Sequence, residues 1–263
     1  MQHFIVIGNP ISHSKSPDIH TAFARLVGID ISYRCQFCPD DFDSLRAVIE
    51  AFFNGGGVGA NVTLPFKEMA FDICQEVGTL SEYAKNAGAV NTLALKNGTL
   101  FGDNTDGQGL VADLVNHGVD LYNKKVAILG AGGATRGVIL PLVQRGARVS
   151  VFNRTPSKAH ILAQNFITQG ITINAHALDD LTGHFDVIIN ATSATTTGQT
   201  LDLGDVSADV AYDMMYGKPS AFLKHFHHAQ QIDGMGMLIN QARLSFELWT
   251  GRTVDLDKVM PNL

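Results

Sequence analysis

The chain has 263 residues, of which 45% are hydrophobic and 17% charged, a balance typical of globular domains that excludes a disordered or fibrous chain. Its 19 basic and 25 acidic residues give a net charge of −6, which disfavours nucleic acid or an anionic membrane as a partner. No apolar run reaches the roughly 18 residues of a membrane span, and the N-terminal segment has no signal-peptide pattern. Three cysteines suit a reducing cytoplasm better than a disulfide framework.

The first hundred residues alternate between strand and helix patterns. Short apolar or alternating runs predict strands, and amphipathic stretches that begin at Ser16-Pro17 or end at glycine predict helices. Asn97-Gly98, between two alternating segments, is a strong hairpin signal. In chain order the predicted elements are a strand at 3–7, helices at 16–27 and 42–52 separated by a strand at 31–37, a strand at 58–62, a helix from about 65, and strands near 89–95 and 99–103.

A second alternation starts after residue 104. The predicted elements are a helix that ends at Gly118, a strand at 125–129, a helix at 133–145, a strand at 148–152, a helix after Thr155-Pro156, strands at 186–189 and 210–212, and a helix at 235–249. Regular alternation over 125–230 predicts a parallel sheet with helices on its faces, so the expected fold class is α/β.

A glycine-rich loop joins the strand at 125–129 to the next helix. It is formed by Gly130, Ala131, Gly132, Gly133 and Ala134. Glycines at this point let backbone N–H groups approach a pyrophosphate at the helix N-terminus. The third glycine of the dinucleotide pattern is replaced by Thr135. The strand–loop–helix context favours a nucleotide site, and the alternative is a plain tight turn.

The end of the following strand distinguishes the two nicotinamide cofactors. An NAD site usually carries an acidic residue there to bind the ribose 2′-hydroxyl. This chain has Asn153, Arg154 and Thr155 instead, followed by Lys158 one turn later. Arginine offers a planar fork for a 2′-phosphate, and lysine adds a point charge. These residues predict NADP, and the alternative is a solvated helix start.

Polar clusters follow several strands of the first half. Ser14 and Ser16 open a helix and suit a carboxylate, although Ser16 also fits a simple N-cap. Lys67 follows the third strand, and Asp106 opens the helix after the hairpin. Considered separately, Lys67 is most simply interpreted as a surface lysine and Asp106 as a helix N-cap. At the carboxyl ends of sheet strands they would form an acid–base pair.

A series of short motifs spans nearly the whole chain. They are Gly8-Asn9-Pro10-Ile11 with His13-Ser14-Lys15-Ser16-Pro17, Asn61-Val62-Thr63 with Pro65-Phe66-Lys67, Gly88-Ala89-Val90-Asn91-Thr92, Gly102-Asp103-Asn104-Thr105-Asp106-Gly107, Gly130-Ala131-Gly132-Gly133-Ala134, Asn153-Arg154-Thr155, Asn190-Ala191-Thr192-Ser193, Asp213-Met214-Met215-Tyr216 and Gly234-Met235-Gly236-Met237-Leu238. With these motifs in this order, the chain resembles the shikimate dehydrogenase family.

The resemblance implies two α/β domains with a cleft between them. Residues 1–104 with 238–263 would bind the substrate, and 105–237 would form a Rossmann-like, doubly wound NADP domain. The implied activity is the reduction of 3-dehydroshikimate to shikimate with NADPH, in aromatic amino-acid biosynthesis. Such an enzyme would act on a small molecule in the cytoplasm, without a metal, as a monomer or homodimer.

The resemblance also implies roles for individual residues of this chain. Lys67 and Asp106 would be the catalytic pair, with Lys67 the favoured proton donor to the C3 ketone. The substrate would be bound by Ser14, Ser16, Asn61, Thr63, Lys67, Asn91, Asp106, Tyr216 and Gln241. NADP would be bound by Gly130, Ala131, Gly132, Gly133, Ala134, Asn153, Arg154, Thr155, Lys158, Thr192, Ser193, Met214, Gly234 and Met237.

Two segments depart from the family pattern, and two alternatives stay open. Residues 194–197 replace an expected early glycine, and the segment after Tyr216 lacks a polar-proline run. The alternatives are a quinate/shikimate dehydrogenase of broader specificity and a non-catalytic NADP-binding regulator. The pair Cys35 and Cys38 would point to opposite sides of a strand, which disfavours a metal or redox site. The histidines at 225–228 are expected to be a solvated helix face.

Overall fold

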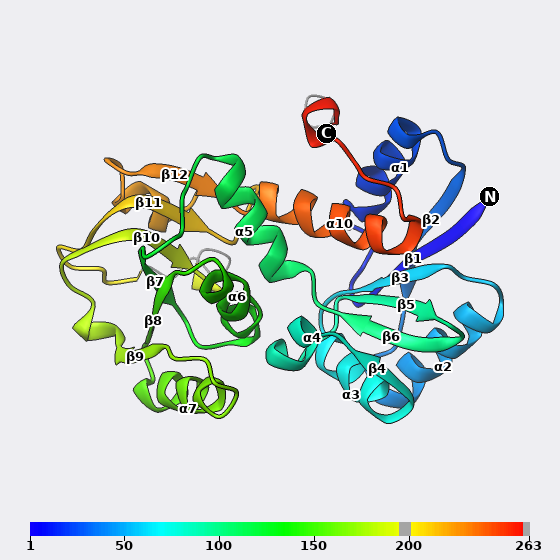
Figure 1. Cartoon of the computed structure of the whole chain (residues 1–263), viewed down its shortest axis with the longest axis horizontal. Coiled ribbons are helices and arrows are strands. Elements are labelled where there is room, and N and C mark those ends of the chain that lie inside the picture. Colours follow the sequence, from blue (N-terminus) through cyan, green and yellow to red (C-terminus); the bar gives the residue numbers. More distant parts are fainter. Residues whose placement is uncertain (195–200, 260–263) are drawn as a thin grey trace. The chain divides into compact units, whose positions relative to one another are not determined.

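A computed structural model describes residues 1–194 and 201–259. The chain divides into two compact units, Met1–Thr105 with Ile239–Leu263 as unit 1 and Asp106–Leu238 as unit 2 (Figure 1). Both units are α/β, as the sequence predicted. No helix in the described part of the chain is long and apolar enough to cross a membrane.

Unit 1 contains a mixed sheet of strand order β2-β1-β3-β5-β6-β4. Its elements are β1 (Gln2–Gly8), α1 (Ser16–Val27), β2 (Ile31–Phe37), α2 (Phe42–Asn54), β3 (Gly59–Val62), α3 (Lys67–Val77), β4 (Gly78–Leu80), α4 (Glu82–Ala87), β5 (Thr92–Lys96), β6 (Thr99–Asp103) and the later turns of α10 (Met235–Thr250). β1 pairs in parallel with β2 and β3, whereas β5 is antiparallel to β3 and β6.

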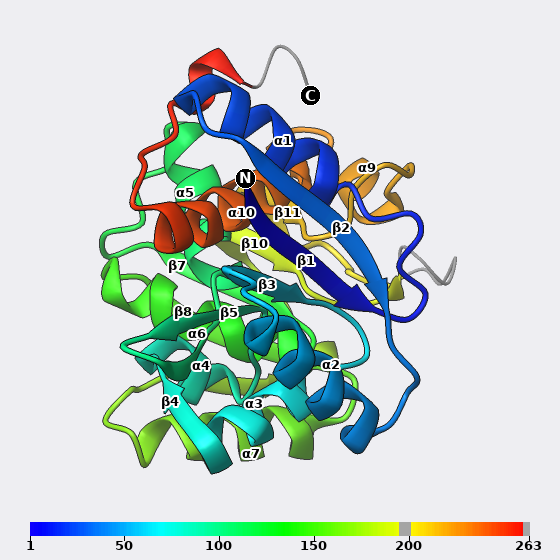
Figure 2. The ribbon, with the colours of Figure 1, turned by 90° about the vertical axis from the view of Figure 1, so that its right-hand side faces the viewer.

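Alternate residues of β1 pack into two separate cores. Ile5 and Ile7 face a cluster supplied by α2 and α3. Phe4 and Val6 face the opposite side, where Trp249 of α10 packs against them. Side chains of a strand alternate between faces, so this one strand positions helices on both sides of the sheet, as the edge-on view shows (Figure 2).

Unit 2 contains a sheet of order β12-β11-β10-β7-β8-β9, in which all the pairs are parallel. Its elements are α5 (Asp106–Asn116), β7 (Lys125–Leu129), α6 (Gly133–Gln144), β8 (Arg148–Asn153), α7 (Pro156–Ile167), β9 (Asn174–Ala177), β10 (His184–Asn190), β11 (Ser207–Asp213), α9 (Ala221–His225) and β12 (Gln230–Asp233). The predicted parallel sheet is confirmed.

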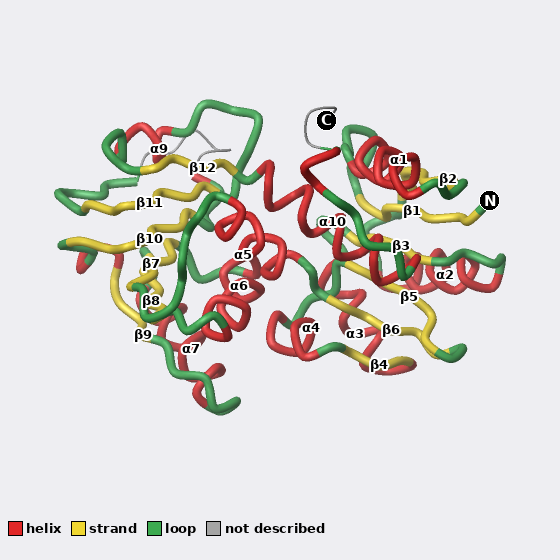
Figure 3. Tube along the Cα trace, turned by 45° about the horizontal axis from the view of Figure 1, so that its top comes forward, coloured by secondary structure: helices red, strands yellow, loops and turns green. Residues whose placement is uncertain are grey.

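Helices α5 and α6 lie side by side on one face of this sheet (Figure 3). Their close approach depends on Gly107, because a Cβ there would lie 2.1 Å from the carbonyl oxygen of Gly137. The strand order reverses at β7, whose neighbours are β8 and β10. In open parallel sheets, the loops at such a switch point form the ligand site.

The helix start at 16–17 differs from the prediction. Ser16 is the first residue of α1 and Lys15 occupies the N-cap position without a side-chain cap. The hydroxyl of Ser14 instead accepts a hydrogen bond from the Ser16 amide at 3.2 Å. Ser14 therefore satisfies one backbone N–H at the start of α1, while the N-cap residue contributes no side-chain cap.

Candidate functional sites in the two units

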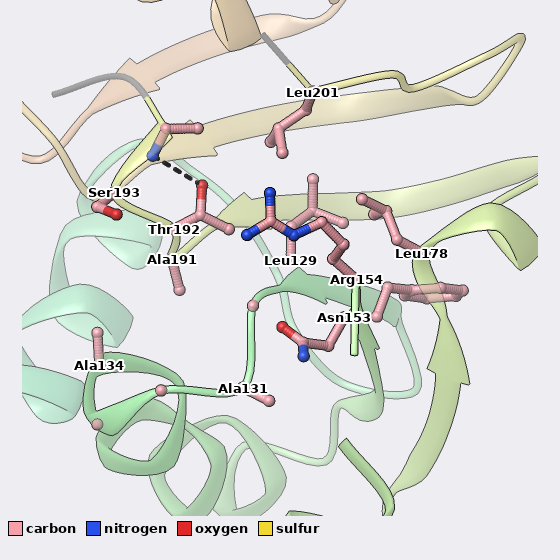
Figure 4. Close-up of a pocket in the computed structure, with 15 residues that line it drawn as sticks. Leu129, Ala131, Ala134, Asn153, Arg154, Leu178, Ala191, Thr192, Ser193 and Leu201 are labelled. Carbon is pink, nitrogen blue, oxygen red and sulfur yellow. Dashed lines mark hydrogen bonds between the residues drawn. The ribbon is translucent and has the colours of Figure 1, made fainter. Parts of the chain in front are cut away.

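A hollow of about 400 Å³ opens at the switch point of unit 2 (Figure 4). The loops after β7, β8 and β10 supply most of its lining, with Leu178 and Leu201 as apolar wall. Gly130, Ala131, Gly132, Gly133, Ala134, Asn153, Arg154, Thr192 and Ser193 line it among the residues that the sequence selected. Leu178 and Leu201 were not anticipated, because no local pattern marks them.

The glycine loop fits a bound pyrophosphate. Gly130 has φ +105°, a conformation that L side chains rarely adopt. A Cβ on Gly132 or Gly133 would meet no atom within 4 Å, so the backbone there borders open space. Gly132 caps α6 without a side-chain hydrogen bond, which leaves helix N–H groups to face an anion.

Thr135 explains the imperfect glycine pattern. Its side chain is fully buried, and its hydroxyl donates to the Gly130 carbonyl at 2.9 Å. The residue at the third glycine position thus ties the first turn of α6 back to the loop, and the loop keeps its shape without a third glycine.

A buried amide–carboxylate pair supports the loop after β10. Asn190 Oδ1 accepts hydrogen bonds from the amide and the hydroxyl of Thr192, at 3.1 and 2.7 Å. Asn190 Nδ2 donates to Asp213 Oδ1 at 3.1 Å, and Asp213 also accepts from the Ser220 hydroxyl. This pair connects the ends of β10 and β11 and places Thr192 at the hollow.

Arg154 supplies a positive charge to the hollow. Asn153 beside it donates from Nδ2 to the Thr155 carbonyl at 2.8 Å. Among the described lining residues none is acidic, so the acceptor that would bind a ribose 2′-hydroxyl is absent from this wall. Thr155 caps α7, and Lys158 is exposed in its first turn outside the lining.

The remaining predicted residues of unit 2 lie after β11 and at the start of α10. A Cβ on Gly234 would lie 2.1 Å from the Met214 carbonyl oxygen, so these two segments touch through backbone. Met214 and Met237 are half-buried and do not line the hollow. Tyr216 is half-buried, and burial raises the pKa of its hydroxyl.

The sheet register of unit 1 gathers polar residues at one edge. Asn61 at the end of β3 pairs with Thr92 at the start of β5, and Thr92 pairs with Asp103 at the end of β6. The segments that contain Asn61, Asn91 and Thr105 therefore meet, although 44 residues separate Asn61 from Thr105 in numbering. Asp106 follows directly and is half-buried.

Asn91 is the centre of this edge. Its Oδ1 accepts from the Thr92 hydroxyl at 2.8 Å and from the Thr105 amide at 3.0 Å. Its Nδ2 donates to Thr105 Oγ1 at 3.0 Å and toward Gln241 Oε1 at 3.5 Å. The structure thus joins two predicted substrate residues, Asn91 and Gln241, that lie on different elements.

Asn61 is buried, and protein groups engage its amide. Its Oδ1 accepts from the Tyr33 hydroxyl at 2.7 Å, and its Nδ2 donates to the Asn91 carbonyl at 3.0 Å. Ser16, also buried, contacts the same tyrosine and opposes the rise in tyrosine pKa that burial causes. Tyr33 thereby connects the serine loop with Asn61.

His20 stacks on Tyr33 with a centroid distance of 4.4 Å. It is fully buried, and neither ring nitrogen has a hydrogen bond of normal geometry. Burial lowers its pKa to about 3, an effect that the nearby Asn61 opposes. His20 is therefore neutral at physiological pH and acts as an aromatic packing residue of unit 1.

Thr63 and Lys67 lie just after β3. Thr63 is half-buried, and its amide donates to the Ile7 carbonyl at 2.9 Å. Lys67 is the first residue of α3 and half-buried, and its carbonyl accepts from the Val90 amide at 2.8 Å. These bonds fix the backbone of both residues beside the segment that carries Asn91.

The sequence analysis disfavoured a metal site at Cys35 and Cys38 and expected the histidines at 225–228 to be solvated. Among residues 1–194 and 201–259 the structure shows no cluster of side chains that could hold a metal ion. Cys35 is exposed, whereas Cys38 and Cys74 are buried, and all three are free. The unusual segment 195–197 lies outside the described residues.

Comparisons with known proteins agree with this geometry. Three family descriptions match the chain: a shikimate dehydrogenase substrate binding domain at residues 6–93, shikimate / quinate 5-dehydrogenase at 112–202, and a shikimate 5′-dehydrogenase C-terminal domain at 234–261. The curated shikimate dehydrogenase (NADP(+)) of Psychrobacter cryohalolentis is 56% identical and covers 97% of this chain and 95% of its own.

Two solved structures show the same fold over the whole chain. An Ael1 enzyme from Pseudomonas putida matches with a TM-score of 0.91 at 36% identity, over 100% of this chain and 98% of its own. A Thermus thermophilus shikimate 5-dehydrogenase in complex with NADP(H) and shikimate matches with a TM-score of 0.85 at 30% identity, over 99% and 98%.

Proposed function

The chain belongs to the shikimate dehydrogenase family and is an NADP-dependent oxidoreductase, and from that premise we propose that it reduces 3-dehydroshikimate to shikimate. The polar edge of unit 1 is the observation that carries the choice of substrate. A ring with several hydroxyls needs amide and hydroxyl groups in fixed positions, and Asn91 with Gln241 supplies them.

Unit 2 is proposed to bind NADP. The N–H groups of the loop Gly130–Ala134 would hold the pyrophosphate, and Arg154 the 2′-phosphate, with Lys158 and Thr155 beside it. Asn153, Thr192, Ser193, Met214, Gly234 and Met237 would complete the site. When bound, the reduced cofactor supplies the hydride, and the protein contributes binding and orientation.

Unit 1 is proposed to bind the substrate. Ser14 and Ser16, at the N-terminus of α1, would bind the carboxylate with their hydroxyls and the favourable helix dipole. Thr63, Asn91, Asp106 and Gln241 would bind ring hydroxyls. Tyr216 would also contact the substrate, and Asn61 would hold Asn91 in place through its carbonyl.

Lys67 and Asp106 are proposed as the catalytic pair. Reduction of a ketone places negative charge on its oxygen, and an ammonium group both stabilises that charge and can give up a proton. Asp106 would orient the lysine and the bound hydroxyl as an acceptor. In the direction of reduction, Lys67 would protonate the oxygen at C3.

The direct test follows NADPH absorbance with purified protein, shikimate and NADP⁺. NAD⁺ and quinate are run in parallel, and Lys67→Ala is compared with Lys85→Ala, an exposed lysine of α4. We expect turnover with shikimate and NADP⁺, a fall of about 10²- to 10⁴-fold in kcat for Lys67→Ala, and NADP⁺ binding retained in calorimetry. Lys85→Ala should behave as wild type.

Other outcomes would redirect the assignment. Comparable turnover with quinate or NAD⁺ would indicate the broader-specificity enzyme. NADP⁺ binding without turnover on either substrate would indicate a regulator. We further propose a cytoplasmic location, because free cysteines, one of them exposed, suit a reducing compartment. Gel filtration would distinguish a monomer from a homodimer.

A further inference from the structure

Ser245 is fully buried on α10, one helical turn after Gln241. Its hydroxyl lies 2.7 Å from Thr92 Oγ1 and 3.1 Å from Asn61 Nδ2. The Ser245 hydroxyl therefore connects α10 to strands β3 and β5, although 153 positions separate Ser245 from Thr92 in the sequence. A buried hydroxyl with several polar neighbours must donate its one proton in a defined direction.

Backbone groups determine where the protons of this cluster lie. The Thr105 amide can only donate, so the Asn91 side-chain atom it contacts at 3.0 Å is the carbonyl oxygen. The Asn91 backbone carbonyl can only accept, so the Asn61 atom at 3.0 Å from it is the amide nitrogen. Both amide orientations follow from these anchors.

The hydroxyl protons follow in turn. Thr92 gives its proton to Asn91 Oδ1 at 2.8 Å, so it must accept in its 2.7 Å contact with Ser245. Ser245 Oγ then accepts from Asn61 Nδ2 at 3.1 Å and shares its one proton between Thr92 Oγ1 at 2.7 Å and the Gln241 backbone carbonyl at 3.1 Å. The chain of contacts runs from Asn61 through Ser245 and Thr92 to Asn91.

We propose that Ser245 is a positioning residue, which acts through Thr92 to hold Asn91 with its amide N–H groups directed toward Thr105 Oγ1 and Gln241 Oε1. A substrate hydroxyl would replace the long 3.5 Å contact with Gln241. This rests on the proposed function, in which Asn91 binds the substrate. An Asn91 that donates to a hydroxyl oxygen leaves that hydroxyl's proton for an acceptor such as the Asp106 carboxylate. The Thr105 amide sets this polarity, and the buried serine supports it through Thr92.

The test compares isosteric variants by steady-state kinetics. Ser245→Ala and Thr92→Val each remove one hydroxyl, and Thr92→Ser keeps it. We expect KM for shikimate to rise about 5- to 20-fold in the first two, with kcat changed less than about threefold and KM for NADP⁺ unchanged. Thr92→Ser should stay within about twofold of wild type.

A matched control separates positioning from general stability. Thr250, also on α10, donates to the Phe246 carbonyl at 2.8 Å and has no bond to the cluster in the described contacts. Thr250→Val should lower Tm slightly and leave KM for shikimate unchanged. A purely structural Ser245 would show the same behaviour, which would overturn the proposal.

A double variant tests the route through Asn91. If Thr92 acts through Asn91, the pair Thr92→Val/Asn91→Ala binds shikimate no more weakly than Asn91→Ala alone. If the losses of shikimate affinity in the two single variants multiply in the double variant, Thr92 does not act through Asn91, and the proposal is refuted. An unchanged KM in Asn91→Ala would remove the proposed substrate role of Asn91, and absence of turnover in the wild-type protein would instead remove the proposed function.

Discussion

Tyr212 anchors α5 to the sheet of unit 2 through a buried carboxylate. Its hydroxyl donates to Asp113 Oδ2 at 2.8 Å, and the two side chains are 0% and 2% exposed. Tyr212→Phe removes this bond and leaves the shape of the core unchanged. A hydrogen bond to a charged, buried acceptor contributes about 1.5–3 kcal/mol. For a chain of this size the loss corresponds to a Tm decrease of about 3–12 °C.

The same variant has a defined pH dependence. Burial raises the pKa of Asp113, and the bond from Tyr212 opposes that rise, as does His117. A carboxyl whose folded pKa is raised destabilises the protein above that pKa and has no effect below the unfolded value near 3.9. Removal of Tyr212 raises the pKa of Asp113 further, so its cost should be greater near pH 8 than near pH 4, close to the unfolded value.

Thermal unfolding at both pH values measures the effect, with Tyr33→Phe as the control. Tyr33 is also buried, but its hydroxyl donates to the neutral amide of Asn61 at 2.7 Å, so its loss should be about 0.5–1.5 kcal/mol and similar at both pH values. A Tyr212→Phe cost that is below about 0.5 kcal/mol, or equal at the two pH values, would refute the reasoning.

Three further changes have clear expectations. Gly130→Ala places a Cβ at φ +105° and 3.1 Å from Thr192 Cγ2, so NADP⁺ affinity in calorimetry should fall by about tenfold; unchanged affinity would contradict the loop's role. Gly236→Ala puts a Cβ 1.9 Å from Asp113 Oδ1 and should cost more than about 2 kcal/mol in urea unfolding. His20 has a pKa near 3, so wild-type stability should fall as pH decreases from about 6.5 toward 3. In His20→Phe, the free energy of unfolding should depend on pH less steeply, by the equivalent of about one proton. The same slope in the variant and the wild type would show that His20 does not titrate as described.

The hollow of unit 2, which we propose as the cofactor site, carries local sequence signals. The strand, glycine loop and helix N-terminus are consecutive, and Gly130 and Arg154 each follow a strand directly. The apolar wall of Leu178 and Leu201 was missed, since it comes from segments that carry no pattern of their own. Lys158 was selected for its charge one turn after Arg154 and Met237 by resemblance, and the structure places neither in the lining of the hollow.

Short edge strands were also missed. β4, β9 and β12 have three or four residues each and lie at or beside the sheet edges. A strand with few buried side chains has little hydrophobic alternation, so its pairing depends on the neighbouring strand. The longer, buried strands β1, β7 and β10 carry enough pattern to be recognised alone.

The sequence by itself determined the α/β class, the order of the principal elements, the glycine loop and the residues at the strand ends, because each depends on neighbours within a few positions. Only the tertiary structure decided which of those ends meet and in what polarity. Ser245 reaches Thr92 across 153 positions, and Tyr212 reaches Asp113 across 99. Such bonds depend on sheet register and helix packing, which local periodicity does not encode, and they orient the side chains on which the proposed chemistry depends.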